Sequence, residues 1–224
     1  MSMTVQSVMD RASILLQDAG NVRWPAAELV GWVNDGRREL VKLKPDVYTQ
    51  LVTLTLVAGE EQSLPARCVS LQDSPRNVNG PAVSVTQRGW LDQQFPDWPM
   101  GAQSGTIQHF MLDERMPTRF WVYPPAVAGT QLKMLVLSLP TDVSASSTLT
   151  DLEELVSGAL VDYVCYRAFS KDAEYAGMAE RALAHQQLFL NALGAVGAVT
   201  LANSPNVSNV GGSKRGPSSQ SQGA

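Results

Sequence analysis

The sequence has few cysteines and no long uninterrupted apolar run. Cys68 and Cys165 lie far apart and form no CxxC pair, so neither a disulfide framework nor a zinc site is indicated. This cysteine usage fits a reducing compartment. The longest apolar stretch, residues 132–139, is interrupted by Lys133 and Ser138 and is far shorter than the roughly 20 residues of a membrane helix. We therefore expect no metal, no disulfide and no membrane segment.

Catalytic motifs are also scarce. His109 and His185 have no serine or cysteine beside them in a recognisable nucleophile motif, so a surface or packing role is favoured for both. There is no Gly-Lys-Ser/Thr phosphate loop. The acidic pairs at 60–61, 113–114 and 153–154 fall in an expected turn, strand end and helix start, where carboxylates have local roles. We assign no reaction and expect no cofactor.

An excess of positive charge is missing as well. The chain has 17 basic and 21 acidic residues, a formal net charge of −4, whereas proteins that wrap nucleic acid need lysine and arginine along the phosphates. An acidic wall would instead let a duplex pass without adhering. Residues 1–13 lack a basic flank followed by an apolar core, which argues against a secretory signal.

What is present begins with two amphipathic helices. Residues 4–17 carry apolar side chains at helical spacing, with Thr4 as N-cap and Gly20 beyond the end. A second helix follows Pro25, which suits a helix start, and ends at Pro45.

Two glycines and two tryptophans indicate that the second helix is packed. Gly31 and Gly36 each cost a helix about 1 kcal/mol relative to alanine, so we expect a neighbour to approach closely at both. Trp24 and Trp32 are expected to fill the seam to the first and last helices.

The pattern then changes to the period of two that is typical of strands. An Asn79-Gly80 pair is typical of a tight hairpin. We predict an antiparallel region of roughly five or six strands, in one sheet or a small sandwich. The candidate strands are residues 48–57, 67–72, 82–87, 107–112, 119–123 and 131–139.

A loop rich in aromatic residues separates the third and fourth candidate strands. It contains Trp90, Phe95 and Trp98 among prolines and glycines. These side chains either plug the sheet or are presented to a partner. The plug is favoured, because large apolar groups are usually buried.

Helical spacing returns after residue 146. Thr150 and Glu153 form a capping box, and a last helix over residues 172–193 is expected to end at Gly194. The predicted fold is α+β, a four-helix bundle built from residues 1–46 and 146–197. Residues 47–145 form an inserted antiparallel β domain, and residues 198–224 form an extended tail.

The tail cannot fold alone. Residues 201–224 are rich in Ser, Gly and Pro, and their large apolar groups are Leu201, Val207 and Val210, too few to offset the ordering entropy. We expect a partner to order this segment, with Lys214 and Arg215 pairing with carboxylates of that partner.

Residues 12–46, ASILLQDAGNVRWPAAELVGWVNDGRRELVKLKPD, resemble the amino-terminal region of head-to-tail adaptor (connector) proteins of short-tailed bacteriophages. The resemblance rests on Leu-Leu-Gln-Asp, then Arg-Trp-Pro, then a helix with Glu-Leu, Trp, Asn-Asp and Arg-Arg-Glu before Pro-Asp. The paired carboxyl-terminal helices are also similar, while the β region matches only in general layout.

The resemblance implies a non-enzymatic protein of the virion neck, assembled in the host bacterial cytoplasm. Such adaptors form a homo-oligomeric ring, usually of twelve copies, that docks under the portal protein and joins it to a tail or nozzle protein. Genomic DNA passes through the lumen without sequence-specific binding. A carboxyl-terminal extension commonly reaches into the portal, which would account for the tail.

Arg37 and Arg38 are the charged residues to which we assign a partner role. They lie on the polar side of the second helix. This side is either a solvated face or a contact to an acidic surface on a neighbouring subunit or the portal. Arginine is enriched at interfaces, so we expect at least one to make such a contact. A virion-associated cell-wall hydrolase and a tail-tube protein without portal contact stay open as alternatives.

Overall fold

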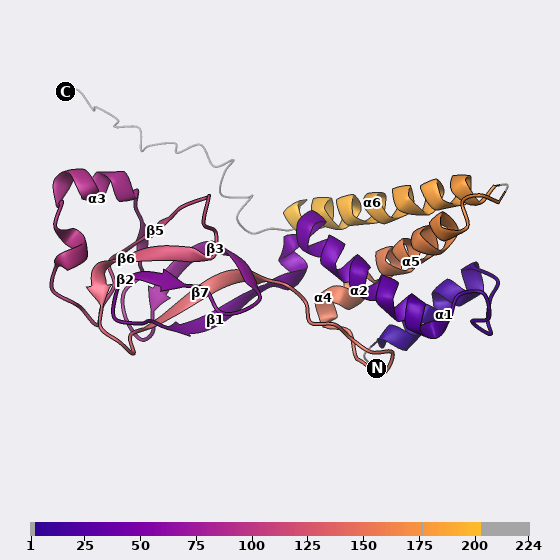
Figure 1. Cartoon of the computed structure of the whole chain (residues 1–224), viewed down its shortest axis with the longest axis horizontal. Coiled ribbons are helices and arrows are strands. Elements are labelled where there is room, and N and C mark those ends of the chain that lie inside the picture. The colour runs from indigo at the N-terminus through magenta and orange to yellow at the C-terminus, as the bar shows by residue number, and fades with distance from the viewer. Residues whose placement is uncertain (1–2, 176, 203–224) are drawn as a thin grey trace, which may run out of the picture.

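The structure, a computed structural model of the chain, describes residues 3–175 and 177–202, without the side chains of residue 74 and residues 196–202. Most helices gather at one end of the molecule, and the strands gather at the other together with one short helix (Figure 1). The class is α+β, as predicted. We call the two ends the helical body and the β body.

The helical body combines the two ends of the chain. Helix α5 lies between α6 on one side and α1 with α2 on the other (Figure 1), and one apolar core runs through all four. The helices are α1 (Val5–Leu15), α2 (Ala26–Leu43), α4 (Asp151–Leu155), α5 (Ser157–Lys171) and α6 (Met178–Ala202). A four-helix bundle is not confirmed, because α4 is a separate short helix and α6 packs chiefly on α5.

Local sequence signals explain where these helices begin. The Thr4 hydroxyl accepts a hydrogen bond from the Ser7 amide at 3.3 Å and caps α1. Pro25 directly precedes α2. The capping box is present at α4, because the Thr150 hydroxyl caps the Glu153 amide while the Glu153 carboxylate accepts from the Thr150 amide. The three predicted starts are confirmed.

The two glycines of α2 have different environments. A Cβ at Gly36 would lie 2.9 Å from a ring carbon of Tyr163, closer than side chains pack, so glycine allows α2 to approach α5 there. A Cβ at Gly31 would meet nothing within 4 Å. The predicted close approach is confirmed at Gly36 and wrong at Gly31.

The β body contains two sheets with the orders β1-β7-β3 and β2-β6-β5-β4. The strands are β1 (Thr49–Thr55), β2 (Gly59–Ser63), β3 (Cys68–Asn77), β4 (Ser84–Val85), β5 (His109–Leu112), β6 (Arg119–Ala126) and β7 (Gln131–Ser138). Buried residues of both sheets, including Phe120 of β6 and Met134 of β7, form one core. The predicted sheet region is present, as two sheets.

Three details of the β body differ from expectation. β2 was not predicted, because its sequence Gly-Glu-Glu-Gln-Ser lacks the β-branched and aromatic residues that mark strands. β4 is only two residues long and pairs with β5 in parallel, whereas the other strand pairs are antiparallel. The aromatic loop contains a helix, α3 (Arg88–Gln94), and a turn of 3₁₀ helix, η2 (Trp98–Met100).

The expected stop of the last helix is wrong. Helix α6 continues through Gly194 and Gly197 to Ala202, so two glycines do not end this helix. Leu201 therefore lies in α6, not in an extended tail. Val207, Val210, Lys214 and Arg215 lie outside the described residues.

Candidate functional site

The chain crosses between the two bodies twice, and both crossings meet one buried ion pair. The first crossing is η1 (Pro45–Tyr48), between α2 and β1, and the second is residues 139–150, between β7 and α4. Arg37 of α2 and Glu153 of α4 lie where these segments meet. Their side chains are 7% and 1% exposed, so this is a buried charge pair.

The Glu153 carboxylate has partners on both oxygens. Oε1 accepts from Arg37 Nε and from the Tyr48 hydroxyl, each at 2.7 Å. Oε2 accepts from the Thr150 amide at 3.0 Å and from the Thr150 hydroxyl at 3.2 Å. Since a buried carboxylate is tolerated only when paired and hydrogen-bonded, these four contacts allow its burial.

The same contacts set the titration behaviour. Burial opposes ionisation of Glu153, but the hydrogen bonds from Thr150, Tyr48 and Arg37 outweigh it and hold the pKa of Glu153 below its usual 4.5. Burial, followed by the nearby Glu153 carboxylate, raises the pKa of the Tyr48 hydroxyl. At neutral pH this site therefore contains an ionised glutamate and a neutral tyrosine.

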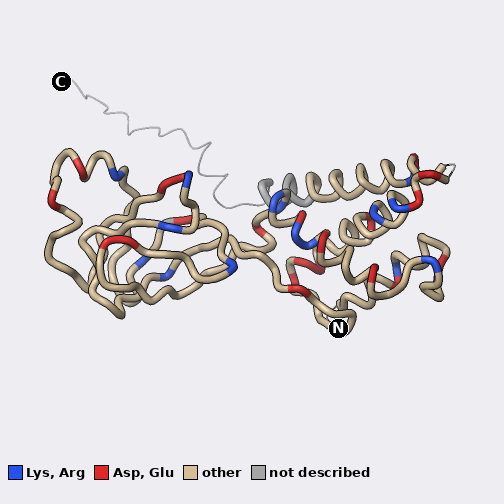
Figure 2. The backbone as a smooth tube through the Cα atoms, in the orientation of Figure 1, with Lys and Arg blue, Asp and Glu red and all other residues tan. Residues whose placement is uncertain are grey.

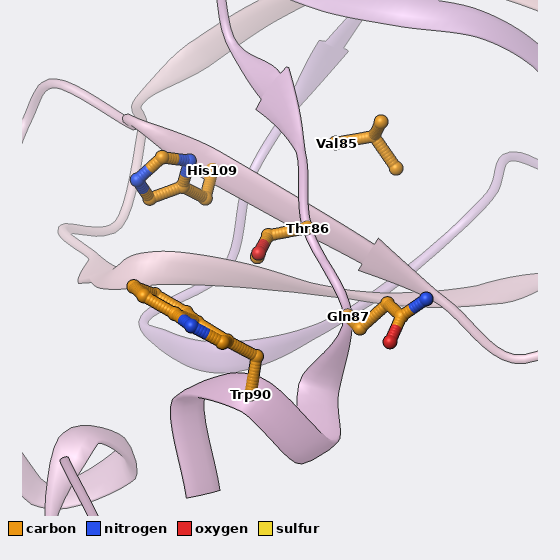
Figure 3. Close-up of a pocket in the computed structure, with 5 residues that line it drawn as sticks. All are labelled: Val85, Thr86, Gln87, Trp90 and His109. Atoms are coloured by element: carbon orange, nitrogen blue, oxygen red, sulfur yellow. The ribbon is translucent and has the colours of Figure 1, made fainter. Parts of the chain in front are cut away.

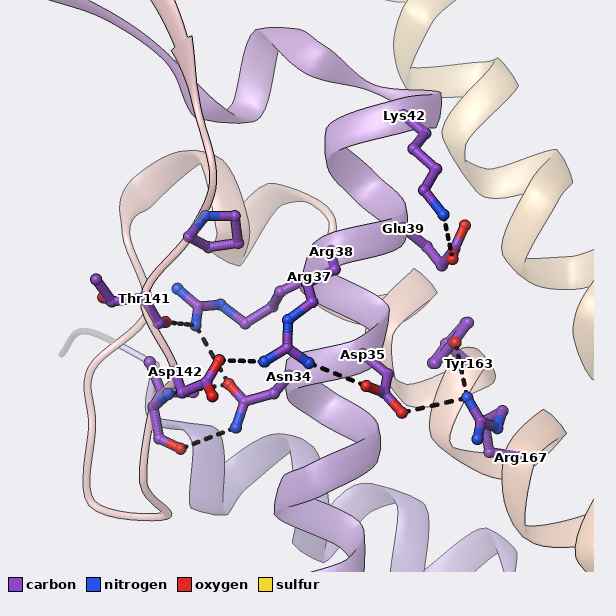
Figure 4. A network of polar contacts seen from close by, with 12 residues as sticks. Asn34, Asp35, Arg37, Arg38, Glu39, Lys42, Thr141, Asp142, Tyr163 and Arg167 are labelled. Carbon is purple, nitrogen blue, oxygen red and sulfur yellow. Dashed lines mark hydrogen bonds and ion pairs between the residues drawn. The ribbon is translucent and has the colours of Figure 1, made fainter. Parts of the chain in front are cut away.

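Arg37 and Asn34 bind the second crossing. Arg37 Nη1 donates to the Thr141 carbonyl at 2.6 Å. The Asn34 amide donates to the Val143 carbonyl at 3.1 Å and accepts from the Val143 amide at 2.9 Å, and Figure 4 shows both residues reaching from α2 to this segment. Through Tyr48 and Thr141, one ion pair contacts both connections between the bodies.

Arg37 and Arg38 thus have different environments. The expectation that Arg37 belongs to the polar surface is wrong, because its guanidinium is buried and bonded within the chain. The Arg38 side chain is 44% exposed and forms ion pairs with Asp35, at 3.0 Å, and with Asp142 (Figure 4). Contact with a partner stays a prediction for both, and by accessibility it is favoured for Arg38.

A cavity of about 340 Å³ opens beside the ion pair. Its walls come from both bodies, with Arg37, Tyr48 and Glu153 facing Ser138, Leu139 and Pro140. The polar groups of Arg37 and Glu153 at its wall already have partners, so the geometry favours a structural junction over a binding site.

The aromatic loop at the far end of the β body divides into an inner and an outer part. Trp98 is 3% exposed, donates from Nε1 to the Asp92 carboxylate at 2.7 Å, and packs edge-on against Tyr123. Trp90 and Phe95 are 50% and 53% exposed and contact each other edge-on. The plug interpretation is confirmed for Trp98, whereas Trp90 and Phe95 lie at the surface, where contact with a partner stays a prediction.

Beside Trp90 is an open pocket of about 590 Å³ at the edge of the four-stranded sheet. In Figure 3, Trp90 of α3 and His109 of β5 lie on either side of Thr86, and the exposed Val85 lines the same pocket. His109 forms a hydrogen bond with the Ser84 hydroxyl at 2.7 Å and stacks on Tyr123. The pocket is a shallow apolar surface, which suits protein contact better than chemistry.

The remaining reactive groups have packing roles. His185 of α6 pairs with Asp162 at 2.9 Å and stacks on Phe169. Burial raises the pKa of the Cys165 thiol to about 12, so it is not a thiolate at neutral pH. Over residues 3–175 and 177–202, no group of three or more His, Cys, Asp and Glu could hold a metal ion, and no helix has the length and apolar character needed to span a bilayer.

Sequence reasoning identified Glu153 as a capping residue but missed its ion pair. The capping box was a local signal, spaced three residues from Thr150. Its pairing with Arg37 joins residues 116 positions apart, and no local pattern indicates such a contact. Of the other predicted partner residues, Leu201 lies in α6 without a described side chain, and the four beyond it lie outside the described residues.

The family comparison covers all of the residues that the structure describes. A search of curated proteins finds no match. The family model of the SU10 adaptor protein matches residues 3–209, which includes both bodies and both crossings between them. The chain therefore belongs to the SU10 adaptor protein family, a family of phage head-to-tail adaptors.

Proposed function

We propose that this chain is the subunit of a ring, of twelve copies, that docks under the phage portal protein and joins it to a tail or nozzle protein. The family match over residues 3–209 is the observation that carries this proposal. The protein acts in the virion neck after assembly in the host cytoplasm, and it performs no reaction and needs no cofactor.

The two bodies suit two different neighbours. The helical body would face the portal, and the β body would face the tail or nozzle protein with the exposed Trp90 and Phe95. Aromatic residues are enriched at protein interfaces and contribute much of their binding energy. The net charge of −4 supports passage of genomic DNA through the lumen without adhesion.

The experiment is a binding assay with purified portal protein, read by native mass. The chain alone is expected to be a monomer or a weak oligomer, and with portal it is expected to form one large complex of fixed stoichiometry. Binding to a tail component but not to portal would favour a tail-tube protein. Clearing of peptidoglycan in a gel assay would favour a cell-wall hydrolase.

The tail supplies a second test. Residues 203–224 contain Lys214 and Arg215 and no acidic residue, which suits an acidic groove on the portal. Deleting residues 203–224 is expected to leave the thermal midpoint of the protein nearly unchanged and to reduce portal binding sharply. A truncated chain that binds portal as tightly as the full chain would remove the tail from the proposal.

A further inference from the structure

Helix α6 is unusual because most of its length lacks charge. Glu180 and Arg181 lie near its start, and residues 182–202 contain no Asp, Glu, Lys or Arg, which Figure 2 shows as a tan tube over the part of α6 that is not drawn in grey. The exposed side of α6 includes the uncharged polar residues Gln187 and Asn191 besides apolar ones, and a helix face with so little charge is normally covered by a neighbour. Yet α6 packs chiefly on α5, and Leu183 and Leu190 are 59% and 46% exposed.

These leucines form a continuous surface with the end of α2. Leu183 and Leu190 are seven residues apart and lie on one side of α6. Across a groove of about 390 Å³, the half-exposed Leu43 of α2 faces Leu190 and Leu193. We call Glu180, Leu183, Leu190 and Leu43 the α6 surface.

A second unpartnered apolar patch lies on a different face of the helical body. The buried side of α1, with Val8 and Ala12, faces the core. Its other side presents Ile14, which is 70% exposed, and Leu15, which is 52% exposed. Arg11 lies on the same side, three and four residues before them. We call Arg11, Ile14 and Leu15 the α1 surface.

The two surfaces carry opposite charges that are free to pair. Arg11 and Glu180 have no ion-pair partner within residues 3–175 and 177–202. Their neighbours in sequence are already engaged, since Asp10 accepts a hydrogen bond from the Gln6 amide at 2.7 Å and Arg181 lies over the Phe169 ring. Each apolar patch therefore has one available charge, a cation on α1 and an anion on α6.

We propose that the α6 surface of one copy packs against the α1 surface of a neighbouring copy, with Glu180 paired to Arg11. The inference rests on the proposed ring, because a contact between two different patches repeats from copy to copy and can close a ring.

The described part of α6 offers a large share of the area of such a contact. Its residues 178–195, whose side chains the structure describes, span about 27 Å, and half of a cylinder of 10–12 Å diameter presents about 450 Å² over that length. A stable interface buries about 800 Å² per partner. Leu43 and the groove beside it supply further apolar area at the end of α2, so the α6 surface can account for about half of one subunit contact.

Disulfide trapping of the full chain tests this pairing. In the double variant Ile14→Cys, Leu183→Cys, concentrated protein under mild oxidation is expected to form a ladder of dimers, trimers and larger species. A mixture of the two single variants is expected to stop at dimers. The wild-type chain controls for Cys68 and Cys165. Dimers from Leu183→Cys alone would show a symmetric α6 contact, and the absence of a ladder would show no contact, so either result overturns the proposal.

Charge exchange tests the predicted ion pair. Arg11→Glu and Glu180→Lys are each expected to weaken self-association by about tenfold or more in sedimentation, because like charges then meet at the contact. A mixture of the two variants is expected to regain association, since each contact in an alternating ring again joins opposite charges. Asp151→Lys, an equal charge reversal at an exposed residue outside both surfaces, is the matched control. Failure of the mixture to recover would overturn the pairing.

Portal binding separates this inference from the proposed function. If the double variant Ile14→Cys, Leu183→Cys forms no ladder but the wild-type chain binds portal, the surface assignment is wrong and the adaptor function stands. If the double variant forms the ladder but the wild-type chain does not bind portal, the assignment stands and the proposed function fails.

Discussion

The helical body and the β body differ in the large side chains that they leave exposed. In the helical body Trp24, Trp32 and Phe169 lie in one continuous core, and the large side chains left outside are mainly aliphatic. In the β body Trp98, Phe120 and Trp121 are buried, but Trp90 and Phe95 are half exposed, and Trp90 lines an open pocket. The comparison indicates that the two bodies present different surfaces to their neighbours. The helical body presents aliphatic side chains, which suit contact with the helices of another copy, and the β body presents aromatic side chains, which suit a different partner.

The two bodies also contribute differently to the junction at the Arg37–Glu153 pair. The helical body supplies both members of the Arg37–Glu153 pair, and the crossing segments contribute a hydroxyl and a backbone carbonyl. The orientation of the β body therefore depends on a buried charge that belongs to the helices. Changes at this pair should affect both bodies, whereas changes within one core should affect one body first.

The largest effect is expected from breaking the buried pair. Glu153→Ala leaves the Arg37 guanidinium buried without its counter-ion, and it should lower the free energy of unfolding by about 3 to 5 kcal/mol. Glu154→Ala, at the exposed neighbouring position, should change it by less than about 0.5 kcal/mol. Chemical denaturation of the two variants gives the comparison. Equal stability of both variants would show that the pair does not hold the junction.

A matched pair of core truncations should show whether the two bodies unfold independently. Trp32→Ala in the helical core and Phe120→Ala in the β core each remove a buried aromatic ring and should cost about 3 to 5 kcal/mol. Hydrogen exchange should show lost protection mainly in the body that carries the change. Uniform loss of protection in both variants would mean that the bodies unfold as one unit.

Within the β body, Trp98→Ala and Trp90→Ala should differ strongly. Trp98→Ala opens a cavity under the loop and should cost about 3 kcal/mol or more, while Trp90→Ala should cost less than about 1 kcal/mol because half of the ring is already exposed. Trp90→Ala should nevertheless weaken binding to the tail component, although the variant protein stays folded. Undiminished binding by Trp90→Ala would remove this surface from the tail interface.

Acidification should destabilise the junction between the two bodies. The pKa of Glu153 is lower in the folded chain than its usual 4.5, so its stabilisation is present above about pH 4.5 and is lost as pH falls through the folded pKa. Glu153→Gln should therefore show a shallower loss of stability on acidification than the wild type. Asp18, whose pKa is lowered first by the Trp24 backbone amide, keeps part of the acid dependence in both. Identical acid profiles would contradict the assignment to Glu153.

The smallest effect on stability is expected at Arg38. Its ion pairs with Asp35 and Asp142 are exposed, and such pairs contribute about 0 to 1 kcal/mol. Arg38→Ala should therefore leave the thermal midpoint nearly unchanged while weakening binding to portal or to a neighbouring copy. Arg37→Ala should instead destabilise the fold, so the two adjacent arginines can be distinguished by thermal denaturation alone.

Local signals in the sequence determined where most elements lie. Thr4 and Thr150 mark helix starts because their side-chain hydroxyls accept hydrogen bonds from backbone amides of the first turn, and Pro25 marks one because it has no backbone N–H to satisfy. Alternation of apolar residues indicated β1 and β7, which pair with each other through seven residues. The adaptor relationship also followed from a local stretch, residues 12–46, because that stretch carries a distinctive order of residue types.

The tertiary structure alone decided the contacts between distant residues. Arg37 is buried because Glu153 and Thr141, more than 100 positions away, supply its partners, and an arginine on a helix otherwise looks like a surface residue. β2 forms because β6 offers it a pairing edge, despite its weak strand propensity. Helix α6 continues past Gly194 although glycine costs a helix about 1 kcal/mol, and the preceding turns of α6 are anchored in the helical core by Phe189 and Leu193. Propensity acts over a few residues, whereas burial and pairing depend on the whole chain.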